Sequence, residues 1–199
     1  MAYKYINPHY FGFIRPKSKN KITKFFITST IKRKYKFLVS AAEIIKNENL
    51  KFHVIVVGKF KTFSKKDIPT NLKDNFTFKY KISYLELYKE IYKSDFIIIN
   101  LDPENIEDIN FKKIRVTGSA QLSYGFIKPV LINEVFSDFY GFNSSNSLIY
   151  SNSNFSKVMK NAINLKKYNY KQIQRNLISL SKEIYTKSLY NIKYFLKLS

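Results

Sequence analysis

The sequence predicts an α/β fold in which a doubly wound parallel sheet carries helices on both faces. Two short stretches, residues 54–57 and 96–99, are apolar at every position, which is typical of strands that helices cover on both sides. Strand-like and helix-like stretches alternate along the chain, and parallel strands need such helical crossovers. The 199 residues, of which 45% are hydrophobic, are enough for one globular domain with a substantial core.

The strands are predicted from short runs of β-branched and aromatic residues. The run at residues 95–100 has no polar alternation, so we place it in the centre of the sheet. Gly58 closes the second strand, and Pro129 separates a helix from the fifth strand. The expected strands cover residues 25–28, 52–57, 76–80, 95–100, 130–132 and 147–150.

The helices are predicted between these strands from apolar residues spaced three and four apart. In the last one, Ile173, Leu177 and Ile184 keep this spacing, and Ser188 is expected to interrupt the helix. We expect it to pack on its own domain, although it could instead cross to a partner domain. A polar linker is expected over residues 59–74. The helical segments cover residues 34–46, 84–92, 116–126, 134–140, 154–165 and 170–198.

The formal net charge of +21 invites a nucleic-acid-binding interpretation. Only 4 of the 35 basic residues are Arg, the residue suited to bidentate phosphate recognition, so 31 are Lys. These Lys residues are spread along the whole chain instead of clustering. We therefore favour a solvated basic surface over nucleic-acid binding, and adhesion to anionic membrane lipids remains an option.

The composition also limits the chemistry and the location that we expect. The chain has no Cys and two His, which excludes a disulfide framework and a structural zinc site, and we expect no metal. Its apolar runs are too short to cross a bilayer, and the N-terminus lacks the apolar segment of a signal peptide. We expect a cytoplasmic chain, with the inner face of the membrane as a peripheral location.

The segment from residue 95 to residue 150 predicts a nucleotide-binding crevice. An acidic loop follows the central strand, and open α/β sheets bind ligands at the carboxyl ends of their strands. The next helix opens on Thr117, Gly118 and Ser119. Such small residues let a phosphate approach free backbone N–H groups, although an ordinary helix cap has the same signature.

Charged residues at the same edge are candidates for binding and catalysis. Lys32, Arg33 and Lys36 follow the first strand, where cations could neutralise a leaving diphosphate and replace a metal. The alternative is a solvated start of the helix. Glu104 and Glu107 lie beyond the carboxyl end of the central strand, and for them a solvated acidic loop is the favoured interpretation.

The order of these motifs resembles the C-terminal, donor-binding half of the GT-B glycosyltransferases, in particular glycosyltransferase families 4 and 1. The resemblance covers nearly the whole chain. Its most specific part is a small-residue helix that leads through Lys128 and Pro129 into a strand. The other matching segments are a strand with a basic loop at residues 28–36, a strand that ends in Gly58, a helix at 84–88, a Ser-Asp strand at 94–96 and residues 146–149.

The resemblance implies a linker-like segment at residues 1–21 and a Rossmann-like domain at residues 22–199. This domain would bind a nucleotide-diphosphate sugar as the donor substrate, with no separate cofactor. The basic residues Lys32, Arg33 and Lys36 and the small residues Thr117, Gly118 and Ser119 would hold the diphosphate, and Glu104 would face the sugar. The family's ribose-binding Glu is missing here. Gln121, in its neighbourhood, can accept one hydrogen bond but lacks the charge.

The implied activity is transfer of a sugar from this donor to a glycan or lipid-linked acceptor, as in cell-surface glycan biosynthesis. Family members carry an acceptor-binding half upstream. The chain would therefore be a shortened enzyme or a donor-binding half that works with a separately encoded acceptor domain. A non-catalytic or decayed Rossmann-like module is the first alternative, because that Glu and the upstream half are missing. A basic nucleic-acid-binding domain is the second.

Overall fold

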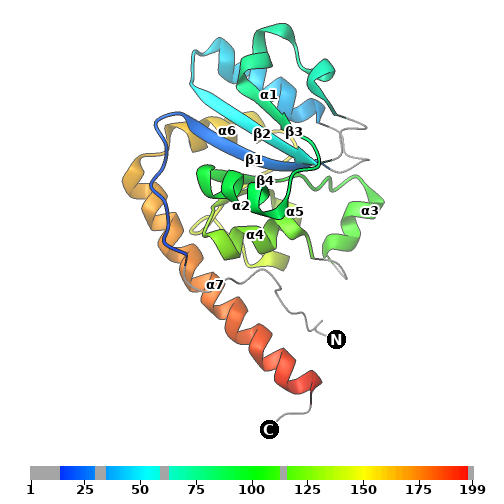
Figure 1. Cartoon of the computed structure of the whole chain (residues 1–199), viewed down its shortest axis with the longest axis vertical. Helices are drawn as coiled ribbons and strands as arrows, with labels where there is room; N and C mark the ends of the chain where they lie inside the picture. Colours follow the sequence, from blue (N-terminus) through cyan, green and yellow to red (C-terminus); the bar gives the residue numbers. More distant parts are fainter. Residues whose placement is uncertain (1–13, 30–34, 59–62, 113–115, 197–199) are drawn as a thin grey trace.

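The computed structural model describes residues 14–29, 35–58, 63–112 and 116–196. Their strands form one sheet in the order β3-β2-β1-β4-β5-β6, and every pairing in it is parallel. The predicted doubly wound sheet is confirmed (Figure 1). The strands are β1 (Thr23–Ser29), β2 (Phe52–Gly58), β3 (Phe76–Lys79), β4 (Phe96–Ile99), β5 (Val130–Asn133) and β6 (Leu148–Tyr150).

Helices cover both faces of the sheet, and side chains alternate between the two cores. In β1, Phe25 and Ile27 point to the core beneath α1 and α6, whereas Phe26 points to the core beneath α2, α4 and most of α7. The helices are α1 (Lys36–Asn47), α2 (Tyr84–Lys93), α3 (Ile106–Ile109), α4 (Gly118–Phe126), α5 (Glu134–Ser137), α6 (Phe155–Asn164) and α7 (Lys167–Phe195).

The strand order reverses between β1 and β4. β1 pairs with β2 on one side and with β4 on the other. The connection after β1 runs through α1 on one face, and the connection into β4 runs through α2 on the opposite face. In open α/β sheets a crevice forms at such a switch point, outside the carboxyl ends of the strands.

Hydrogen bonds fix the amino ends of β1 and β4 to each other. The Asp95 carboxylate, 1% exposed, accepts hydrogen bonds from the backbone N–H of Asn20 (2.8 Å), the side-chain amide of Asn20 (2.9 Å) and the backbone N–H of Lys24 (2.7 Å). The Tyr170 hydroxyl of α7 donates to the Asp95 carbonyl at 2.7 Å. The register of the two strands at the switch point therefore depends on this buried carboxylate.

The prediction of a polar linker over residues 59–74 is wrong for its described part. Residues 65–67 and 70–75 form short 3-10 helices, and Phe63, Ile68 and Leu72 are buried in the core beneath α1. The Phe63 ring stacks on Tyr35 with centroids 4.3 Å apart. The apolar residues of this connection are spaced irregularly, so neither a helical nor a strand period reveals their burial.

The last helix is continuous, so the predicted break at Ser188 is wrong. The Ser188 hydroxyl donates to the Ile184 carbonyl at 2.8 Å, which satisfies it within the helix. The first part of α7 packs on its own domain as expected, because Leu177 is buried and the Ser181 hydroxyl donates to the Tyr124 carbonyl at 2.9 Å. The second part projects beyond the sheet (Figure 1).

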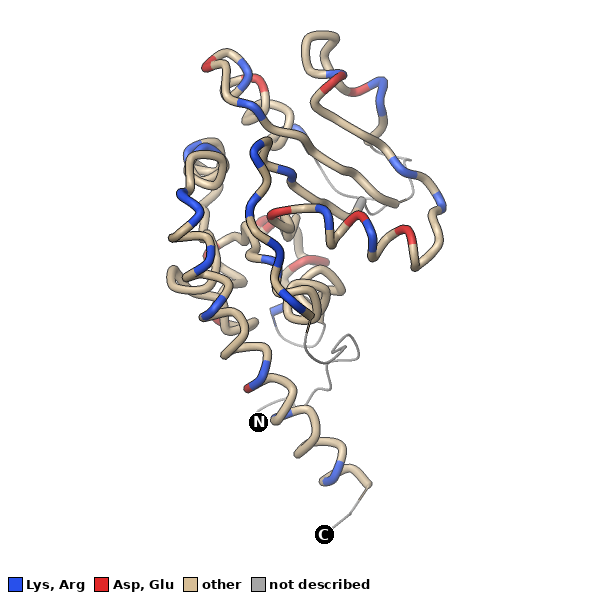
Figure 2. The backbone as a smooth tube through the Cα atoms, turned by 60° about the vertical axis from the view of Figure 1, so that its left-hand side comes forward, with Lys and Arg blue, Asp and Glu red and all other residues tan. Residues whose placement is uncertain are grey.

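Basic residues are distributed over the described surface, as Figure 2 shows. Lys and Arg recur along α7 and in the connections, whereas the acidic residues are few. Within the described ranges, no helix combines the length and the apolar character needed to cross a membrane.

Candidate functional site

A cavity of about 550 Å³ opens at the switch point. Its walls come from the start of α1, from the loop after β4 and from the segment between β6 and α6. All three lie at the carboxyl edge of the sheet, where the topology predicts a ligand. The lining residues are Lys36, Phe37, Asn100, Leu101, Asp102, Glu104, Asn105, Asp108, Tyr150, Asn152 and Phe155.

The acidic loop after β4 is held in shape by its own side chains. The buried Asp108 carboxylate accepts a hydrogen bond from the Asp102 backbone N–H at 2.9 Å. The Asp102 carboxylate accepts one from the Glu104 N–H at 2.9 Å, and the Asn105 side chain caps α3. The loop is thus a folded turn with a short helix, and Glu104 and Glu107, for which a solvated position was favoured, are both exposed.

One wall of the cavity is aromatic. Phe155 of α6 meets Phe37 of α1 edge to face, with ring centroids 4.7 Å apart, and Tyr150 in the same geometry at 4.8 Å. The Tyr150 hydroxyl donates to the Ile99 carbonyl at 3.3 Å, which fixes the ring beside the end of β4. The cavity therefore combines apolar ring surface with carboxylates on the opposite loop.

Asn152 connects the two sides of this cavity. Its side-chain oxygen accepts a hydrogen bond from the Asn133 amide at 2.8 Å, and its own amide lies 3.5 Å from Glu104 Oε1. Glu104 is exposed and approaches Asn152 across the mouth of the cavity. Sequence reasoning missed Asn152 because no local pattern distinguishes it; only the placement of β6 beside β5 brings it here.

The start of α4 lies beside the carboxyl end of β1. The hydroxyls of Thr28 and Ser119 share a hydrogen bond at 3.1 Å. The Thr117 side chain accepts from the Ser119 N–H at 3.4 Å, and the Thr117 N–H donates to the Tyr140 hydroxyl at 3.2 Å. Gly118 is exposed, and a methyl group added to it would meet nothing within 4 Å. Of the three predicted residues, Gly118 leaves room for a ligand.

The predicted site residues thus separate into two groups. Lys36 and Glu104 line the cavity, whereas Thr117, Gly118 and Ser119 stand beside the end of β1 without lining it. Gln121, one turn into α4, is half-buried and also lies outside the lining. Lys32 and Arg33 fall outside the described residues.

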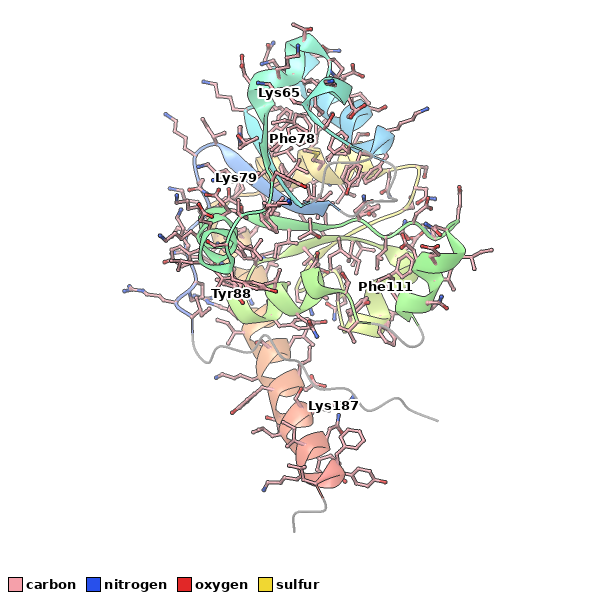
Figure 3. The ribbon with its side chains drawn as sticks, turned by 45° about the vertical axis from the view of Figure 1, so that its right-hand side comes forward. Lys65, Phe78, Lys79, Tyr88, Phe111 and Lys187 are labelled. Atoms are coloured by element: carbon pink, nitrogen blue, oxygen red, sulfur yellow. The ribbon has the colours of Figure 1, made fainter. Side chains whose placement is uncertain are left out.

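A smaller hollow of about 270 Å³ lies at the carboxyl ends of β2 and β3. Gly58, Lys81 and Tyr84 are among its lining residues. Tyr84 opens α2, the helix whose Tyr88 packs on Phe126 of α4 with ring centroids 5.4 Å apart (Figure 3). The hollow and the cavity lie on either side of the end of β1 along one edge of the sheet.

The titratable groups of the described residues offer no metal centre. No three His, Asp or Glu side chains in the described ranges are arranged to hold a metal ion. Burial and the nearby Lys24 lower the pKa of His53, whose Nε2 lies 2.8 Å from the Thr77 hydroxyl. His53 lies at the amino end of β2, opposite the cavity, and has a structural role.

Comparisons with known proteins find similarity in structure only. No family model matches the chain. No curated protein matches its sequence either. HepE from Anabaena in complex with UDP-glucose superposes with a TM-score of 0.59 at 11% identity, covering 89% of this chain and 49% of HepE. Sucrose-phosphate synthase from Thermosynechococcus elongatus gives 0.59 at 14% identity, covering 90% and 46%.

The present chain therefore spans about half the length of these two proteins. The C-terminal domain of LpcC, a group 1 family glycosyl transferase from Francisella tularensis, is similar over most of its length. It superposes with a TM-score of 0.57 at 12% identity, covering 81% of this chain and 85% of the LpcC domain. The chain thus has the fold of the C-terminal half of the GT-B glycosyltransferases.

Proposed function

We propose that the chain binds a nucleotide-diphosphate sugar at the carboxyl edge of its sheet, as the donor-binding part of a glycosyltransferase. The observation that carries this proposal is the cavity of about 550 Å³ at the switch point, which Lys36 and Glu104 both line. The fold supports it, since it is shared with proteins whose structures contain UDP-glucose or UDP-2-fluoro glucose.

The geometry suggests where each part of the donor would lie. The nucleobase would occupy the hollow beside Tyr84, and the glycosyl group would enter the cavity toward Glu104. The diphosphate would lie between them, near Lys36, Gly118 and the basic residues Lys32 and Arg33 that follow β1 in the sequence.

Catalysis would then depend on charge and position instead of a metal. The cations would neutralise the leaving diphosphate, because opposite charges held in place stabilise charge that develops in the transition state. Gln121 would contact the ribose in place of the Glu that the family uses there. Binding orients the donor for attack, which supplies a large part of the rate enhancement in such reactions.

The acceptor side would come from a separately encoded domain, with a glycan or a lipid-linked sugar as the acceptor. In this proposal residues 1–21 form a linker and residues 22–199 the donor domain. The cleft between two such halves would exclude water from the reacting sugar. The many exposed Lys residues favour a working place at an anionic membrane surface, where each adds electrostatic attraction.

The proposal is tested by calorimetric titration of the chain with UDP, GDP, ADP and CMP and with their sugar conjugates. We expect saturable binding of one nucleotide class. Lys36→Ala should weaken it about tenfold, as expected for losing a hydrogen bond to a charged group. Lys46→Ala, an exposed change at the other end of α1, should leave it unchanged.

Gly118→Ala and Arg33→Ala complete the test. The alanine methyl at position 118 meets no protein atom within 4 Å, so it occupies only the space of an approaching phosphate. This variant should keep its thermal stability and lose nucleotide affinity. Absence of binding to any nucleotide would favour the non-catalytic module, and salt-dependent binding to DNA or RNA would favour the nucleic-acid-binding alternative.

A further inference from the structure

We infer that the outer part of α7, residues 185–196, docks on an anionic membrane surface and lies along it. This inference rests on the membrane location in the proposed function, and it names the segment that makes the contact. It follows from apolar residues that neither core of the domain uses, from the basic residues beside them and from the place of the helix in the fold.

The apolar residues of this outer part do not belong to the core. Among the described residues of α7, Ile184 is the last one in either core. Beyond it, Leu189 is 42% exposed and Leu196 is 61% exposed, and Ile192 between them is half-buried. Because these three residues are spaced three and four apart, they lie on one side of the helix. They form an apolar stripe that the domain leaves in contact with water.

The place of the helix makes this stripe accessible. The outer part of α7 projects beyond the sheet and the helices that cover it (Figure 1). Ser188 and Asn191 are buried, so one side of the outer part is covered, whereas the neighbouring side with the stripe is open. A helix with an apolar side and a basic polar side can lie in the plane of a membrane interface, with the apolar side at the acyl boundary.

Basic residues border the stripe and favour an anionic surface. Lys182 and Lys193 are both exposed, and they lie two turns before and one turn after Leu189, on the adjacent side of the helix. Glu183 is the acidic residue of α7, against six Lys and Arg. The aliphatic stem of a Lys can lie along apolar surface while its ammonium group reaches lipid phosphates. The basic residues of α7 are Lys167, Lys171, Arg175, Lys182, Lys187 and Lys193.

Aromatic side chains complete the contact surface. Tyr190, Tyr194 and Phe195 are all exposed in the last two turns of the helix. A Tyr side chain combines an apolar ring with a polar hydroxyl, and such side chains are enriched where a membrane meets water. An anionic bilayer offers a match for each group, namely acyl chains for the stripe, the headgroup region for the Tyr rings and phosphates for the Lys residues.

The test is co-sedimentation of the chain with lipid vesicles in the absence of nucleotide. The vesicles contain phosphatidylcholine alone or with about 30% phosphatidylglycerol, at about 150 mM salt. We expect at least about tenfold tighter binding to the anionic vesicles. The double variant Leu189→Asn, Leu196→Asn keeps the net charge but should bind them at least about tenfold more weakly than wild type, because it buries less apolar surface.

Leu85→Asn is the matched control, because Leu85 is 64% exposed on α2, away from the stripe. It should bind anionic vesicles as wild type does. All three Leu side chains are exposed, so the melting temperatures of the variants should stay close to that of wild type. If the double variant bound the anionic vesicles as tightly as Leu85→Asn, the Lys residues spread over the surface would account for the binding, and the inference would be overturned.

Two further results would overturn the inference in other ways. Failure of wild type to bind anionic vesicles would remove it together with the membrane location in the proposed function. A wild-type dimer in sedimentation velocity that the double variant loses would assign the stripe to a second copy of the chain. Donor binding is separate, so the double variant should bind nucleotide as wild type does, and a chain that binds no nucleotide would lose the donor site while the vesicle result stands.

Discussion

Replacing Asp95 by Asn tests how the two strands at the switch point are held together. The wild-type carboxylate accepts three hydrogen bonds at 2.7 to 2.9 Å from Asn20 and Lys24, in a site that is 1% exposed. An Asn side chain has one acceptor oxygen. If this oxygen keeps the two bonds from Asn20, the new amide group faces the Lys24 N–H, and two donors meet without an acceptor.

The expected cost follows from these contacts. An unsatisfied buried donor costs about 1–3 kcal/mol, and the two remaining bonds change from charge-assisted to neutral, which costs about 1 kcal/mol more. We therefore expect a loss of about 3 kcal/mol in the free energy of unfolding. For a domain of this size that loss corresponds to a melting temperature lower by about 6–12 °C.

Urea denaturation of both proteins measures the difference, and Asp138→Asn provides the control. Asp138 is exposed, so the same chemical change there should alter stability by less than about 0.5 kcal/mol. If Asp95→Asn lost no more stability than Asp138→Asn, the argument that this carboxylate fixes the register of β1 and β4 would be refuted.

Two further predictions concern buried groups. Burial lowers the pKa of Lys128 to about 8, and the nearby Asp95 opposes this shift. Above pH 8 the folded chain has released the Lys128 proton, which the unfolded chain keeps up to a pH of about 10.5. The free energy of unfolding therefore rises with pH between these two values. Between pH 7 and pH 9.5, urea denaturation should show the free energy of unfolding of the wild type rising by about 2 kcal/mol relative to that of Lys128→Met. If the difference between the two proteins were the same at both pH values, the lowered pKa would be contradicted. Phe63→Ala should cost about 3–5 kcal/mol in thermal denaturation, since Phe63 is buried and stacks on Tyr35, whereas a cost below 1 kcal/mol would mean that the connection is not part of the core.

The sheet could be predicted because strands that are buried on both faces are apolar at every position. Residues 54–57 and 96–99 are apolar without alternation, and both lie inside strands that are buried between two layers of helices. The order of the strands in the sheet could not be predicted from these apolar runs alone. The motif order and the resemblance together indicated the doubly wound arrangement, and the parallel pairing of β1 with β2 and β4 bears it out.

The cavity could be predicted only in part, because its lining residues come from segments that lie far apart in the sequence. Lys36 and Glu104 were identified because each follows a strand whose carboxyl end is visible in the sequence. Asn152 stands 48 residues beyond Glu104 in a chain rich in Asn, and no pattern of spacing singles it out. The aromatic wall could not be predicted either, since Phe37 and Phe155 meet only after α1 and α6 pack on one face of the sheet.

The start of α4 shows how capping and ligand binding compete for the same groups. The sequence allowed both roles for Thr117, Gly118 and Ser119. In the fold, the N–H groups of Thr117 and Ser119 already have acceptors in Tyr140 and in the Thr117 hydroxyl. A phosphate here would therefore gain mainly the Gly118 N–H, and much less than a free helix terminus offers. The charge of a bound diphosphate must then be met chiefly by the basic segment that follows β1. For this reason we expect the cation variants to reduce nucleotide affinity more than Gly118→Ala does.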